Sequence, residues 1–354
     1  MLRVKHVMHY LAAITLSCLA MFAGRAEACM VCIPFPEDTA TDQLLRADVV
    51  VLARENPDKP FSFVAVEVLK GDLDNLAIDQ FVDSTTRRRL ALRPGHSVVL
   101  TLDAATKHWR SAGYDTPAYQ ALVREILTQS PFWNLSGQAE NRAIFFLPYL
   151  ADADPAVHKL AYLEVGRASY DTVRRADSVV PTAQVHRFLA NPQYLEWHAL
   201  YILLLGVNAH PDEAKVIRAT MESRAQFDSK LNLSAWATAL IEIDGAEAIG
   251  WLEAVYLGAH DRKSDTVLEI VKALSVHGTR NQSSLRQRIA DSYGVLIQSH
   301  PSLAGWATRD LTSWNDWRFA GVLAELRESP LELDGATAYA IDYYIGQAQS
   351  SASN

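Results

Sequence analysis

The sequence feature that most constrains the fold is a pair of short apolar helices predicted over residues 141–167. The turn Asp-Ala-Asp-Pro at residues 152–155 separates them, because proline disrupts a helix interior but is favoured in a first helical turn. Looser copies of this pattern follow through residues 135–350. Since each helix needs a neighbour to cover its apolar stripe, the pattern predicts helical pairs stacked into an α-α solenoid.

Hydrophobic periodicity supports these helices, as where Trp236, Leu240 and Ile243 fall on one helical face. A non-repeating helical bundle is the alternative arrangement. The predicted pairs are 141–151 with 155–168, 181–190 with 193–207, 212–226 with 233–243, and 246–258 with 262–276, followed by a less regular end at 283–298, 301–312, 316–327 and 335–347.

Residues 29–130 have a different pattern, in which short runs of alternating or continuous apolar residues end at turn residues. Such runs are typical of strands, and five of them favour a small curled sheet or a barrel. The predicted fold class is therefore α+β multidomain, with a five-stranded β-barrel before the helices. The predicted strands are 48–54, 61–69, 78–82, 97–103 and 107–111, and a helix over 117–127 closes the region.

The first 28 residues predict a secretory signal peptide. Arg3 and Lys5 precede an apolar run at 11–23, and Ala26-Glu27-Ala28 is a small-residue cleavage site. We therefore expect export to the periplasm or secretion, with no stable transmembrane segment after cleavage. A retained anchor is disfavoured, because the run is shorter than the ~20 apolar residues of a spanning helix. Lipid attachment at Cys29 is a third hypothesis, although Glu27 stands where lipoprotein signals usually have a small residue.

The charge of the chain argues against a nucleic-acid partner. Removal of the signal peptide takes away three basic residues and one acidic residue, so the formal net charge changes from −8 to −10. General nucleic-acid binding needs a basic surface for the phosphate backbone. The run of three arginines at 87–89 is a local exception, and we expect it in a solvated loop.

Cys29 and Cys32 are the two cysteines left after cleavage. In an oxidising compartment they could pair with each other or with other thiols, and a structural disulfide between them is favoured. A redox centre would place such a motif at a helix N-terminus, whereas Ile-Pro-Phe-Pro follows here. Half of a zinc site is a further alternative, but the sequence has no second cysteine pair to complete it.

Two family resemblances accompany these patterns. The export signal, a mature N-terminal Cys29 and the segments ADVVV (47–51) and FVAVEVLKG (63–71) resemble the netrin-like module shared with tissue inhibitors of metalloproteinases. That resemblance implies an OB-type barrel and a Cys29 whose amine and carbonyl chelate a target's zinc. This chain departs from the family's C-x-C pattern and its further disulfides. The turn DADPAV (152–157) with the leucines after it resembles HEAT-like repeats, which are scaffolds.

The sequence favours a non-enzymatic protein that binds a protein or peptide through its helical surface. HExxH, GxSxG, P-loop and dinucleotide-binding motifs are absent from the sequence, so we predict no catalytic, cofactor-binding or metal-binding residues. Trp314 and Trp317 flank polar residues and are the predicted partner surface. A protease inhibitor acting through Cys29 and an enzyme with a site between the two domains are the alternative hypotheses.

Overall fold

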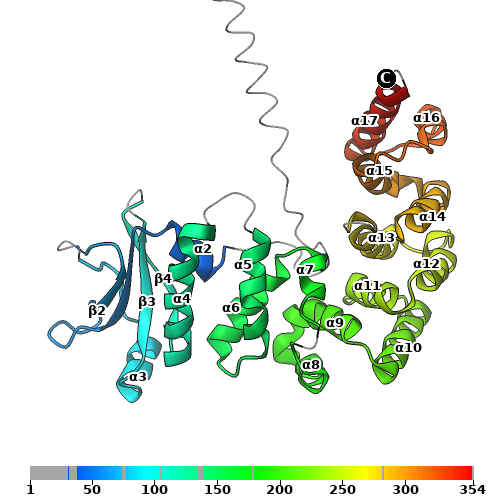
Figure 1. Ribbon diagram of the computed structural model, residues 1–354. Helices are drawn as coiled ribbons and strands as arrows, with labels where there is room; N and C mark the ends of the chain where they lie inside the picture. The colour runs from blue at the N-terminus through cyan, green and yellow to red at the C-terminus, as the bar shows by residue number, and fades with distance from the viewer. Residues whose placement is uncertain are drawn as a thin grey trace, which may run out of the picture.

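The protein combines one small antiparallel sheet with a long series of helices (Figure 1). The predicted mixed α+β composition is confirmed. The predicted signal peptide, Cys29 and Cys32 lie outside the described residues. The computed structural model describes residues 31, 38–73, 77–103, 106–133, 139–177, 179–280 and 283–352.

The sheet has four strands in the order β2-β1-β3-β4, and each neighbouring pair is antiparallel. Its central strands β1 and β3 read as nearly continuous apolar runs because both of their faces are covered. The order leaves β2 and β4 as edge strands, so the described sheet is open and is not a closed barrel. The strands are β1 Val49–Glu55, β2 Phe63–Lys70, β3 Ser97–Asp103 and β4 His108–Asp115.

The prediction of a fifth strand at 78–82 is wrong. That segment makes only one isolated bridge, between Ser62 and Phe81. Helix α3 (Ser84–Leu92) follows it and contains the run of three arginines expected in a loop. The Asp83 carboxylate accepts hydrogen bonds from the backbone N–H groups of the first turn, so it caps the helix and stops the chain from continuing as a strand.

The remaining helices confirm most of the predicted helical elements, with shifts of a few residues at their ends. The short helices α2 and α7 were not predicted, and α4 continues through Pro131, beyond the predicted end at residue 127. The elements are α2 Ala40–Arg46, α4 Pro117–Trp133, α5 Ala139–Phe146, η1 Leu147–Ala151, α6 Pro155–Gly166, α7 Tyr170–Arg174, α8 Thr182–Leu189, η2 Pro192–Trp197, α9 His198–Val207, α10 Pro211–Phe227, α11 Leu233–Asp244, α12 Ala246–Leu252, η3 Glu253–Leu257, α13 Ser264–Thr279, α14 Arg286–Ser299, η4 Pro301–Leu303, α15 Ala304–Ser313, α16 Ala320–Glu328 and α17 Gly335–Ala352.

The C-terminal helices contact one another in order along the chain. Helices α9, α11, α13, α15 and α17 form one row of successive contacts, and α10, α14 and α16 pack against it (Figure 1). One hydrophobic core runs from the inner face of the sheet, through Leu52 and Val99, as far as Tyr344 in α17. A smaller core lies under the other face of the sheet and includes Trp109.

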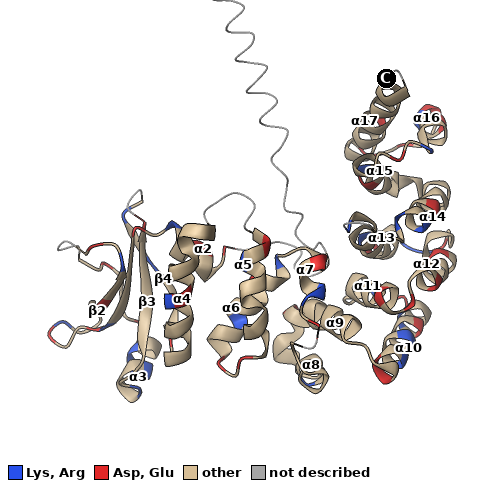
Figure 2. Ribbon diagram, in the orientation of Figure 1, with Lys and Arg blue, Asp and Glu red and all other residues tan. Residues whose placement is uncertain are grey.

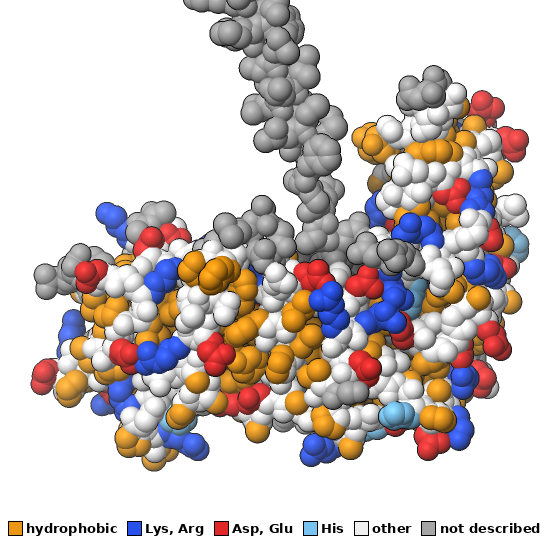
Figure 3. Space-filling model, in the orientation of Figure 1, with side chains coloured by type: hydrophobic (Ala, Val, Ile, Leu, Met, Phe, Trp, Pro, Cys, Tyr) orange, Lys and Arg blue, Asp and Glu red, His pale blue; other side chains and the backbone are white. Residues whose placement is uncertain are grey.

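Charge and apolar surface are distributed differently over the molecule. Figure 2 shows acidic and basic residues interspersed along the helical rows. Figure 3 shows apolar side chains gathered over α4, α5 and α6, where the sheet meets the first helices. The surface near this junction is therefore more suited to a partner with apolar side chains than the charged rows are.

Gly206 marks the closest approach of α9 and α11, and substitution there should destabilise the row. A Cβ at Gly206 would lie 2.8 Å from both Cα and Cβ of Ala239. We expect Gly206→Ala to lower the free energy of unfolding by about 1–3 kcal/mol, because the helix backbones must separate. The control is Gly346→Ala in α17, where a Cβ meets nothing within 4 Å. Because alanine has the higher helix propensity, this variant should raise the free energy of unfolding by up to about 1 kcal/mol. Chemical denaturation of both variants is the measurement, and equal effects would contradict the close packing.

Candidate functional site

A cleft of about 1240 Å³ opens where the sheet meets the first helix pair. Edge strand β4 forms one side of it with residues 111–114, and α2 adds Thr39 and Gln43. Helix α6 and η2 form the opposite side, with Leu160, Leu163 and Trp197 among the lining residues. Small-molecule pockets commonly measure about 300–1,000 Å³, so this junction cleft has room for a larger ligand such as a polypeptide segment.

The floor of the junction cleft is apolar and aromatic. Tyr162 and Trp197 stack with their ring centroids 4.6 Å apart. The Tyr119 hydroxyl donates a hydrogen bond to the Ala112 carbonyl of β4, at 2.7 Å, which fixes the helix α4 side of the floor. Burial raises the pKa of Tyr119 above its usual range, so its hydroxyl remains a neutral donor. These three rings are buried, so they support the cleft from behind, and the half-buried Leu163 is among the apolar side chains that remain accessible in it.

Behind this floor, His158 lies within a cluster of aromatic rings. Its Nε2 atom is 2.6 Å from the Tyr201 hydroxyl, and its ring stacks on Phe188 with centroids 4.8 Å apart. Burial lowers the pKa of His158, which favours the neutral imidazole. His158 therefore supports the cleft lining from inside the protein, through its contact with the Trp197 ring, whose centroid is 5.5 Å away.

The rim of the junction cleft carries charges of both signs. Asp154 caps α6 and accepts a hydrogen bond from the Thr116 hydroxyl at 2.5 Å. Arg89 lies over the Tyr114 ring, with its guanidinium carbon 5.5 Å from the ring centroid. Lys159 also lines the rim and is exposed. A partner in the cleft would thus meet the half-buried Leu163 and a charged border.

Buried polar atoms next to the cleft have unused hydrogen-bonding capacity. In the part of the chain that the structure describes, the Gln43 Oε1 atom and the Tyr114 hydroxyl are buried without a hydrogen-bond partner. Both carboxylate oxygens of Asp115 also lack a hydrogen-bond partner among the described residues, and the residue is only 1% exposed. Buried polar groups are normally hydrogen-bonded, so such a group often indicates a functional or strained position.

Asp115 has a strongly raised pKa of about 7. Burial is the largest cause, and the carboxylates of Asp154 and Glu67 act in the same direction, while Arg124 opposes them. The carboxyl group therefore takes up a proton far more readily than an exposed aspartate. It lies at the end of β4, immediately before α4, so its charge state affects the junction between the sheet and the helices.

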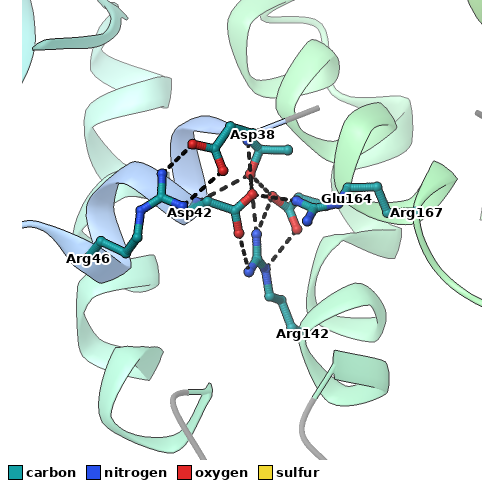
Figure 4. A network of polar contacts seen from close by, with 7 residues as sticks. Asp38, Asp42, Arg46, Arg142, Glu164 and Arg167 are labelled. Carbon is teal, nitrogen blue, oxygen red and sulfur yellow. Dashed lines mark hydrogen bonds and ion pairs between the residues drawn. The ribbon is translucent and has the colours of Figure 1, made fainter. Parts of the chain in front are cut away.

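An ion-pair network, the α2 latch, fastens α2 to α5 and α6 (Figure 4). Arg142 donates to both oxygens of Glu164, at 2.8 and 2.7 Å, and to Asp42 Oδ1 at 2.8 Å. The Thr39 hydroxyl donates to Glu164 at 2.5 Å, and Arg167 donates to Asp42 at 2.5 Å. The latch holds α2, which lines the cleft, in a fixed position between the sheet and the first helix pair.

The pKa of Asp42 shows that the latch stabilises charged groups. Burial alone would raise the pKa of Asp42, but the hydrogen bond from the Thr39 backbone and the charges of Arg142 and Arg167 lower it to about 2. Burial likewise opposes the charged form of Arg142, yet Glu164 and Asp42 raise its pKa. Asp42 and Arg142 therefore stay charged because their partners are present.

The tryptophans expected to form a partner surface lie elsewhere and are half-buried. Trp314 stacks on Tyr293 with ring centroids 5.8 Å apart, and Trp317 contacts Tyr344 at 5.3 Å. Both rings thus take part in packing between the last helices, and they lie outside the junction cleft. Their role as a partner surface stays a prediction.

Among the described residues, His, Cys, Asp and Glu side chains form no group of three or more that could hold a metal ion. The described helices also include none that is long and apolar enough to cross a membrane. No protein-family model, curated protein or solved structure matches the chain. The HEAT-like and netrin-like resemblances therefore stay predictions, and the junction cleft is the main structural guide to function.

Proposed function

We propose that this chain is an exported, non-enzymatic interaction protein that binds a polypeptide partner in the junction cleft. In this proposal the helices form a HEAT-like α-solenoid and the open sheet is a netrin-like module fused to its first pair. The partner is a protein or peptide in the cell envelope or outside the cell, in keeping with the predicted signal peptide. The proposal needs no cofactor and no nucleic acid.

The observation that carries this proposal is the combination of size and lining in the junction cleft. Its volume of about 1240 Å³ exceeds that of common small-molecule pockets. The half-buried Leu163 and Ala156 of α6 supply accessible apolar contact area next to the buried, stacked Tyr162 and Trp197 rings, and Lys159 and Glu196 are exposed at the rim. An apolar centre surrounded by a polar rim is typical of protein-binding sites.

The test is to select peptides from a displayed eight-residue library on the mature chain and to measure their affinity for two variants. Leu163→Arg places a charge on the cleft wall, and we expect it to weaken binding at least about tenfold. Leu331→Arg is the matched control, because Leu331 is 47% exposed at the far end of the molecule. Equal binding by the two variants, with unchanged circular dichroism, would exclude the cleft as the binding site.

The alternative hypotheses have less support. Cys29, on which protease inhibition depends, lies outside the described residues. The idea of an enzyme with an interdomain site has a cleft in the expected place, but Thr39 and Thr116, two of its lining hydroxyls, donate to Glu164 and Asp154 in the latch and the helix cap. These two hydroxyls therefore have structural hydrogen bonds and are not available as catalytic groups.

A further inference from the structure

Strand β4 presents its free edge, and not only a face, to the junction cleft. The strand order ends at β4, so one side of this strand has no neighbouring strand in the described sheet. The four successive residues 111–114 all line the cleft. Since successive side chains of a strand point to opposite faces, a cavity that touches four in a row runs along the strand's edge.

We propose that the partner is an extended peptide segment that adds to β4 as a fifth strand of the sheet. This inference rests on the proposed function and specifies how the cleft holds its ligand. Main-chain hydrogen bonds to an exposed edge would provide affinity, and the alternating side chains would provide selectivity. Exposed strand edges tend to pair with the sheets of other molecules. The walls of the cleft protect the edge of β4 from such pairing.

The backbone hydrogen bonds of β4 define where the peptide can pair. Among the described residues, 111–114 make no backbone–backbone hydrogen bond outside the sheet. The side chain of Gln80 donates to the Trp109 carbonyl at 2.6 Å and so covers the strand before the cleft. The Tyr119 hydroxyl already occupies the Ala112 carbonyl. The available edge is thus about four residues long, which suits a short extended segment rather than a long strand.

The walls of the cleft define the side chains that the peptide should carry. Residues of the added strand would point alternately toward the half-buried Ala156 and Leu163 on the α6 side of the cleft and away from them. We therefore expect apolar residues at every second position of the peptide, with polar residues between them.

Charge at the rim favours a peptide that carries charges of both signs. In the described structure Asp38 pairs with Arg46, which compensates its charge, whereas Asp154 is bound only by neutral donors such as the Thr116 hydroxyl. Arg89 and Lys159 therefore face two acidic counterparts among the lining residues, Asp154 and Glu196. With two cations and two anions at the rim, complementary charge should select a peptide with both acidic and basic residues.

The experiment uses the tightest peptides from the eight-residue library, resynthesised with one backbone amide methylated at a time. N-methylation removes an N–H donor, so strand addition predicts an alternating pattern: at least about a tenfold loss at every second amide and little loss between them. Hydrogen exchange of the full mature chain should also slow at residues 111–114 when the peptide is bound. A flat methylation profile with no added protection would overturn strand addition.

The rim prediction is tested on the same peptides with the double variant Arg89→Glu and Lys159→Glu. We expect its affinity for peptides that carry acidic residues to fall about tenfold or more, while Lys215→Glu, on the exposed face of α10, changes little. Peptides that depend on Leu163 but show a flat methylation profile would leave the proposed function standing and refute strand addition. Failure of the library to yield any peptide would refute both.

Discussion

Replacement of Arg142 by alanine is expected to lower the free energy of unfolding by about 3–5 kcal/mol. Arg142 binds both Glu164 oxygens and Asp42, and the Glu164 side chain is only 3% exposed. Without the guanidinium, Glu164 would remain a buried charge with only the Thr39 hydroxyl as a partner in the latch. Removal of one member of a buried ion pair costs this much because the other charge stays desolvated.

The matched control for this prediction is Arg46→Ala, which lies one turn away in the same helix, α2, as Asp42. Arg46 pairs with Asp38, and both side chains are more than half exposed. Exposed pairs contribute about 0–1 kcal/mol, so this variant should unfold nearly as the parent does. Urea denaturation of both variants is the measurement. Similar small losses in the two proteins would mean that the latch does not stabilise the junction.

Asp115→Asn is expected to stabilise the protein at neutral and alkaline pH, with an effect that disappears near pH 4. The folded carboxyl keeps its proton up to a pKa of about 7, whereas an unfolded aspartate loses it near 3.8. Between these values the folded state binds more protons, so raising the pH favours unfolding. At about 1.4 kcal/mol for each pKa unit, the free energy of unfolding of the parent falls by on the order of 4 kcal/mol between pH 4 and pH 8. The asparagine variant has no carboxyl to titrate at this position and should not show this fall.

The measurement is the difference in unfolding free energy between parent and variant from pH 4 to pH 8. A difference is needed because His277 acts in the opposite direction: burial lowers its pKa to about 4, so its protonation in the unfolded state costs stability as the pH falls. Asp212→Asn is the control, since the Asp212 side chain is 90% exposed. A pH-independent difference for the Asp115 variant would show that this carboxyl is not held neutral by the fold.

The sequence predicted most helices because their signals are local. Periodicity and proline turns located α6 and α11 within about two residues of their ends. Strand β4 was harder: it extends to Asp115 through Gly113, which has φ +147° and weakens the apolar alternation. The fifth strand failed because the Asp83 cap begins a helix directly after it.

The candidate site was less accessible to sequence reasoning than the fold. Leu160 and Leu163 belong to the predicted repeat motif, but their position opposite β4 depends on tertiary packing. The latch joins Asp42 to Arg142, which are 100 residues apart, and no local pattern relates such a pair. Polar residues such as Glu164 within an apolar helix were the one available signal, since a buried charge requires a partner.

The latch also determines the order in which the chain can mature. During synthesis, Asp42 of α2 emerges 100 residues before Arg142, and Thr39, which caps α2, emerges 125 residues before Glu164. At typical elongation rates of about 5–20 residues per second, Arg142 and Glu164 are synthesised at least several seconds after α2. The latch around α2 is thus completed only after α6 has been synthesised. A fragment that ends before α5 should therefore be less stable than the full chain and should bind chaperones.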